Sequence, residues 1–231
     1  MPVGVFVNCF GVLAGGVLGT LLGKHLPQSL KDYLPALFGF CSIGIGINSI
    51  IKASSMTAVV LAILAGFYIG HTLHLEKWTS RFFSGLVKVM HLGSDSIDMD
   101  FYITAVALFC CSGFGWYSAL TEGITGDPSL LISKAVLDGF TALIFASTLG
   151  TAICAIPLPQ AGILFLVFGA GKLLSGFLTP AMFADLSACG GILTMAAGFR
   201  VSKIKSVPLV DLMPALILVM PFSALWTRLM G

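Results

Sequence analysis

A short segment near the middle of the chain holds ionisable side chains whose spacing could support chemistry. Asp127 followed by Pro128 predicts the start of a helix, because a capping carboxylate before a proline at the first helical position is favourable. Counted from there, residues 127, 131, 134 and 138 share one helix face, and Lys134 and Asp138 are spaced as an i,i+4 pair. One interpretation is a helix cap with a structural ion pair. The other is a polar site in which Lys134 holds an anion or Asp138 takes a cation or a proton.

Two further polar residues in apolar stretches, Asn48 and Asp211, are second-rank candidates for such a site. Polar and ionisable groups inside membrane spans are costly, and they often mark a solute or ion path. Asp211 precedes Pro214, which predicts a local helix distortion that frees backbone carbonyls. Asn8 and Asn48 also suit the hydrogen bonds that hold membrane helices together.

The composition requires a membrane to position these residues. The chain is 57% hydrophobic and 10% charged, against roughly 25% charged in a soluble domain. Its mean hydropathy of +1.02 over the full length excludes a soluble globular domain. The net charge of +2 comes without any basic run interleaved with aromatics, so we expect a lipid bilayer as partner and no nucleic acid.

The fold class predicted from apolar stretches of about 20 residues is an all-α membrane protein with eight transmembrane helices. The predicted spans are 3–23, 33–51, 56–75, 101–119, 132–155, 160–178, a short seventh span at 184–199, and 207–227. Between the third and fourth spans, residues 77–92 have helical spacing of apolar and basic residues, which predicts an amphipathic surface helix before a break at 93–96.

Basic residues predict the orientation of these spans. Eight Lys and Arg residues fall on one face of the predicted topology and four on the other, so the first face is cytoplasmic. We therefore expect a multi-pass protein of the bacterial inner membrane with both termini outside the cytoplasm.

An internal repeat emerges when the sequence is shifted by 153 residues. Gly16 then meets Gly169, Pro27 meets Pro180, and Asp32 meets Asp185. The single membrane domain 1–231 then divides into a three-helix repeat (1–75), a surface segment and loop (76–100), a central pair (101–157) and a second three-helix repeat (158–231). Five spans separate the starts of the copies, so this 3+2+3 arrangement is an inverted repeat, as in many secondary transporters.

Gly11, Gly15, Gly19 and Gly23 form an uninterrupted row at every fourth residue of the first span. Such a glycine zipper gives a smooth helix face that lets another backbone approach closely. We expect it to pack within the bundle or between the protomers of a homo-oligomer.

Enzyme signatures are absent from the sequence. The chain has no zinc-protease, nucleophile-elbow or nucleotide-binding motif. Ser49-x-x-Lys52 has the spacing of a Ser-Lys dyad, but it sits at a span end where both residues are ordinary. We expect no enzyme, no cofactor and no metal site.

The stretch 113–150 resembles the YqgA/YdfK-like family of bacterial inner-membrane proteins. The resemblance rests on Gly123 to Pro128, Lys134, Leu137 to Gly139 and Ala146 to Gly150, and it extends over essentially the whole chain. It implies a multi-span membrane protein, often described as a transport protein, without an established substrate.

These observations favour a small secondary transporter or channel-like protein for an unidentified small solute or ion. Its candidate site is lined by Asp127, Lys134 and Asp138, with Asn48 and Asp211 in second rank. The alternative is a non-transporting scaffold or accessory subunit of a membrane complex. An intramembrane Ser-Lys hydrolase is a third reading.

Overall fold

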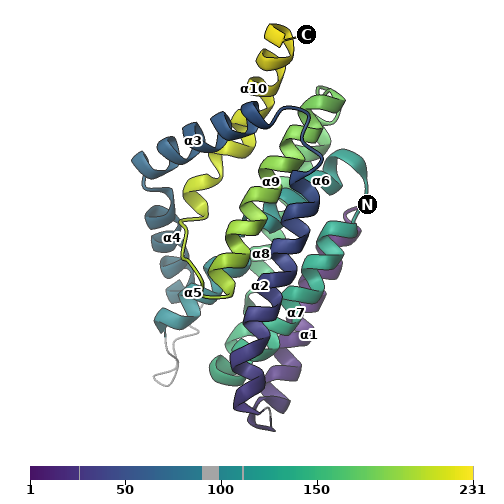
Figure 1. The fold of residues 1–231 in the computed structure, drawn as a ribbon. Coiled ribbons are helices and arrows are strands. Elements are labelled where there is room, and N and C mark those ends of the chain that lie inside the picture. Colours follow the sequence, from purple (N-terminus) through teal and green to yellow (C-terminus); the bar gives the residue numbers. More distant parts are fainter. Residues whose placement is uncertain (26, 90–98, 111, 231) are drawn as a thin grey trace. The chain divides into compact units, whose positions relative to one another are not determined.

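The protein is helical throughout the residues that the computed structural model describes, which are 1–25, 27–89, 99–110 and 112–230 (Figure 1). Its α-helices are α1 (Val3–Leu22), α2 (Gln28–Ile50), α3 (Met56–Thr72), α4 (Leu75–Val89), α5 (Met99–Cys110), α6 (Gly113–Thr125), α7 (Ser129–Leu149), α8 (Pro157–Leu174), α9 (Pro180–Val201) and α10 (Pro214–Met230). Short 3-10 turns, η1 (Gly23–His25), η2 (Gly150–Ala155) and η3 (Val210–Leu212), flank three of them.

Six helices of the described chain are long and apolar enough to cross a membrane, or seven if α3 and α4 count as one span. Those two helices are bent by 56° at the break between them. The all-helical membrane class is therefore confirmed, while these criteria give fewer spans than the eight predicted. The predicted break at 93–96 lies outside the described residues.

The fourth predicted span, 101–119, is divided between two shorter helices. α5 has 12 residues and α6 has 13, and Ser112 before α6 has extended backbone angles (φ −67°, ψ 123°). Trp116 Nε1 donates to the Cys110 carbonyl at 2.9 Å, which satisfies an acceptor left free where α5 ends. Apolar composition alone gives no sign of this break.

The seventh span is not short, contrary to our prediction. α9 has 22 residues and begins after Thr179, whose hydroxyl accepts from the Met182 amide, with Pro180 at the first helical position. The predicted span began beside Asp185, because a carboxylate is expected at a span end, whereas α9 begins four residues before position 184. The Asp185 side chain is fully buried and accepts hydrogen bonds from the Ser54 and Ser55 amides and the Ser223 hydroxyl.

Two compact units make up the chain. Unit 1 comprises Met1–Pro35 and Trp78–Leu173, and unit 2 comprises Ala36–Lys77 and Leu174–Gly231. Each unit therefore combines parts of both predicted three-helix segments. A cluster of Val5, Ala119, Leu131 and Leu164 forms a buried core within unit 1.

The glycine row of α1 lies against α7 within unit 1 (Figure 1). A Cβ added at Gly11 would lie 2.8 Å from the Ala135 carbonyl oxygen, and one at Gly15 would collide with the Gly139 carbonyl. Gly19 and Gly23 meet residues 143 and 147 in the same way, so the two helices run in the same direction. Backbone contact of this kind needs glycine, and it fixes α1 beside the polar face of α7.

We predict that Gly15→Ala destabilises the protein by about 1–3 kcal/mol, because its methyl group must push α1 away from α7. Gly162→Ala on α8 is the matched control, because an added Cβ meets nothing within 4 Å there. Thermal unfolding of both variants in detergent measures the difference. Equal stability of the two variants would contradict the close backbone contact between α1 and α7.

Candidate polar site within the membrane spans

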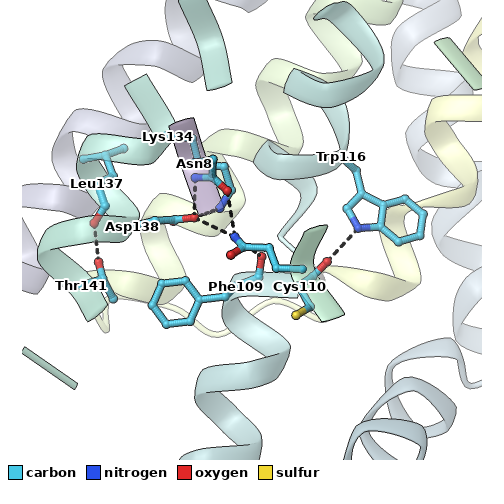
Figure 2. A network of polar contacts seen from close by, with 9 residues as sticks. Asn8, Phe109, Cys110, Trp116, Lys134, Leu137, Asp138 and Thr141 are labelled. Carbon is cyan, nitrogen blue, oxygen red and sulfur yellow. Dashed lines mark hydrogen bonds and ion pairs between the residues drawn. The ribbon is translucent and has the colours of Figure 1, made fainter. Parts of the chain in front are cut away.

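Asp138 is the centre of a polar network between three helices of unit 1 (Figure 2). Its Oδ2 atom forms an ion pair with Lys134 Nζ one turn earlier on α7. The same oxygen accepts a hydrogen bond from Asn8 Nδ2 of α1 at 3.0 Å and one from Gln160 Nε2 of α8 at 3.2 Å. Gln160 Nε2 also donates to Asn8 Oδ1 at 2.9 Å. One carboxylate thus joins residues that are more than 100 positions apart in the sequence.

The network is buried. Asn8 and Gln160 are fully buried, the Lys134 side chain is 2% exposed, and the Asp138 side chain is 15% exposed. Removing both charges from water is costly unless they pair and their remaining hydrogen-bonding capacity is satisfied. The two carboxamides supply that capacity to Asp138, so the charges compensate each other inside an apolar span.

The helix geometry also favours a negative charge at this point. Asn8 lies in the second turn of α1, and Gln160 lies in the first turn of α8. The N-terminal ends of helices carry partial positive charge. The N-terminal end of α8 therefore lies beside the Asp138 carboxylate together with the Lys134 ammonium, while α1 contributes the Asn8 side-chain donor.

Asp127, a predicted site residue, does not belong to this network. It is exposed before α7, which begins at Ser129, and its Oδ1 accepts from the Ser129 amide at 3.0 Å and from the Ser129 hydroxyl. These bonds lower the pKa of Asp127, because they stabilise the ionised carboxylate. Gly126, with φ of 78°, ends α6 and makes the turn into this loop. Asp127 therefore fixes the start of α7 from the surface.

The two second-rank candidates belong to unit 2. Asn48 is exposed on α2. Asp211 is buried, and it accepts from the Glu76 amide at the start of α4 at 2.9 Å and contacts His71 Nδ1 at 3.4 Å. Glu76 in turn pairs with Arg200 at 2.9 Å. Asp211 therefore caps a helix N-terminus, and it is not part of the Asp138 network.

The sequence predicts only a role in helix association for Asn8, and no role for Gln160. Both are carboxamides near the start of an apolar helix, and they are 152 residues apart. That spacing is one residue less than the repeat offset of 153, so an ungapped shift misses the match. A search for equivalent polar residues within one position of the offset would have found it.

Comparison with known proteins identifies the family. A family model described as "Protein of unknown function (DUF554)" matches residues 3–224. The chain belongs to this family. The DUF554 chain is 42% identical to "Uncharacterized protein YqgA" of Escherichia coli over 98% of both chains. It is 27% identical to "Uncharacterized membrane protein YdfK" of Bacillus subtilis over 93% of both chains. No solved structure matches it.

We predict that Lys134→Met destabilises this DUF554 protein by about 3–5 kcal/mol, because it leaves the Asp138 carboxylate buried without its cation. The double variant Lys134→Met/Asp138→Asn should recover most of that loss, because the uncompensated charge is gone. Unfolding midpoints of both variants measure the coupling. A double variant as unstable as Lys134→Met alone would contradict an ionic pair.

Proposed function

We propose that the protein is a small secondary transporter or channel-like protein of the bacterial inner membrane, for a small solute or ion. The site is formed by Asn8, Lys134, Asp138 and Gln160 (Figure 2). The observation that carries the proposal is the Lys134–Asp138 ion pair inside α7, a helix of membrane-spanning length. Carboxamides of α1 and α8 are hydrogen-bonded to this pair. Ionisable groups at such positions are costly and typically serve solute or ion movement.

We infer that the chain contains an inverted repeat, and the bounds of two helix pairs support this inference. Shifting the bounds of α1 by 153 residues gives 156–175, against Pro157–Leu174 for α8. The same shift of α2 gives 181–203, against Pro180–Val201 for α9. These two pairs of helices therefore begin and end at nearly equivalent residues, whereas α3 shifted by 153 gives 209–225, five residues before α10 (Pro214–Met230).

Contacts between corresponding helices also agree with a two-fold relation. In unit 2, Gly39 approaches the Gly198 carbonyl oxygen and Gly46 approaches that of Gly191, each with an added Cβ at 2.6 Å. α2 and α9 are therefore antiparallel. Gly39 and Gly191 are 152 residues apart, as are Gly46 and Gly198, so each contact is the counterpart of the other.

Unit 1 has the same relation at its polar network. Asn8 and Gln160 are also 152 residues apart, and they bond directly to each other. The contact between Phe6 and Phe165 indicates that α1 and α8 run in opposite directions. A pseudo-two-fold axis would then pass beside the Asn8–Gln160 pair. Inverted-repeat transporters bind their substrate at the repeat interface.

The 3+2+3 arrangement with eight crossings fits this symmetry if α3 forms the third crossing, α5 and α6 together form one broken crossing, and α4 is the predicted surface helix. The starts of the two copies are then five crossings apart, an odd number, so the copies are inverted. The distribution of basic residues favours both termini outside the cytoplasm. Alkaline phosphatase fused to either terminus would then be active, and a fluorescent reporter that folds only in the cytoplasm would be dark.

The alternative is a structural or accessory membrane protein, and one observation favours it. The glycine row of α1 and the Lys134–Asp138 pair both have partners inside the chain, as expected for elements that only stabilise a bundle.

A homo-oligomer stays a prediction. A Ser-Lys nucleophile has little support. The hydroxyl of Ser49 donates to the Ile45 carbonyl, and that of Ser202, which also lies three residues before a lysine, donates to the Gly198 carbonyl.

Accessibility to water distinguishes the two functions without knowledge of the solute. We predict that Gln160→Cys, in a chain whose own cysteines are replaced, reacts in membranes with a charged methanethiosulfonate reagent. A transport site must meet water from at least one side, although Gln160 is fully buried.

Leu164→Cys is the matched control, because Leu164 is 1% exposed and lies one turn further along α8. It should stay unreactive. Equal and negligible labelling of the two positions would favour the accessory reading.

A further inference from the structure

In the described part of the chain, the buried side-chain oxygens without a protein partner all lie in unit 1. Within the described residues, the four such side-chain atoms are Ser118 Oγ, Thr121 Oγ1, Glu122 Oε2 and Gln160 Oε1. Three of them are on α6, at positions i, i+3 and i+4, so they share one helix face. Ser118 and Glu122 are each 1% exposed, and Thr121 is 7% exposed.

The hydroxyls on this face differ from other hydroxyls in the helices. Thr125, further along α6, donates to the Thr121 carbonyl at 2.8 Å, as Ser and Thr in apolar helices commonly do. Thr141 and Thr194 donate to the preceding turn in the same way. Ser118 and Thr121 do not, so their hydroxyl groups remain available to another molecule.

Glu122 has one satisfied and one unsatisfied oxygen. Its Oε1 accepts from the Gly4 amide at 2.8 Å, in the first turn of α1, where backbone donors lack partners within the helix. Its Oε2 lies against Gly4, where an added Cβ would be 2.7 Å away, and it has no donor among the described residues. A buried carboxylate oxygen without a donor is unfavourable. Adding a proton to Oε2 removes the charge and turns this oxygen into a donor.

The same face of α6 continues to the Lys134–Asp138 pair. Gly115 precedes Ser118 by one turn, and a Cβ added there would lie 2.8 Å from Lys134 Cε and 3.7 Å from Nζ. The seven residues from Gly115 to Glu122 span about 10 Å along the helix. A row of polar groups thus runs from Glu122, one turn before the end of α6, to the ion pair of Figure 2.

We propose that Glu122 is a proton-exchange site, with Ser118 and Thr121 holding the water that carries the proton. A hydronium ion gives its proton to Glu122 Oε2, which leaves a neutral acid and a water molecule, and the reverse step returns the proton. Gly4 stays bonded to Oε1 in both states. This inference does not rest on the proposed transport function, because a proton can exchange at Glu122 whether or not a solute crosses.

Several other ionisable groups lie on the elements around Glu122. They are Tyr117 on α6, Asp127 in the loop after it, Lys134 and Asp138 on α7, Cys9 on α1, the N-terminal amine before α1, and Lys172 on α8, whose backbone nitrogen lies 3.0 Å from a Cβ added at Gly123. Among these, Lys134 lies beside Gly115 at the other end of the polar row. The experiment therefore has to separate Glu122 from Asp127 and Asp138 by substitution.

Infrared difference spectroscopy of the protein in nanodiscs, between acidic and alkaline buffer, tests the proposal. The wild type should show the C=O band of a buried protonated carboxyl, and Glu122→Gln should lose it. The glutamine retains an oxygen that can accept from the Gly4 amide, so this variant should fold, as size-exclusion chromatography would verify. Asp127→Asn, at an exposed carboxyl in the next loop, and Asp138→Asn, at the ion pair, should each keep the band.

A second pair of variants covers the case in which Glu122→Gln fails to fold. Ser118→Ala and Thr121→Val should each shift the band, because they remove a hydroxyl that orders water at Oε2. The proposal is overturned if Glu122→Gln keeps the band or if neither hydroxyl variant shifts it. It is also overturned if sodium ions at constant pH reproduce the spectral change, since the site would then bind a metal cation.

Discussion

The charge of Asp138 is the constraint on which unit 1 depends. A carboxylate inside an apolar helix persists only with a cation and hydrogen-bond donors around it. Lys134 supplies the cation from the same helix, while Asn8 and Gln160 supply donors from two others. The glycine face of α1 lets that helix approach α7 closely enough for Asn8 to take part. The contact between α1 and α7 therefore provides both the close packing of the two helices and a hydrogen-bond donor for Asp138.

Unit 2 uses its buried carboxylates differently. Asp185 accepts from the amides before α3, and Asp211 accepts from an amide at the start of α4. Both neutralise the free donors of helix N-termini and need no side-chain cation for that purpose. The Asp138 network, with its paired charge, is therefore a stronger candidate for a solute or ion site than the capping carboxylates Asp185 and Asp211.

The sequence was informative where the physical signal is local. The apolar composition established the membrane class, and the i,i+4 spacing of Lys134 and Asp138 correctly predicted their contact. It was uninformative where long-range partners decide the outcome. Asp185 marked the predicted start of a span although it is buried inside α9, where it caps α3. The break at Ser112 leaves no hydropathy signal. Gln160 corresponds to Asn8 at a spacing of 152 residues, one less than the repeat offset of 153, so the ungapped repeat does not reveal its role.

Flux into proteoliposomes measures directly whether this protein moves a solute or ion through the site at Asp138. Purified protein would be reconstituted and assayed with sodium, potassium, chloride, amino acids and sugars, with empty liposomes for background. If Asp138 belongs to a transport site, flux exceeds background for at least one solute. We expect this flux to be lost in Asp138→Asn and retained in Gly162→Ala. Background flux for every solute, or an Asp138→Asn variant as active as the wild type, would contradict a transport site at this network.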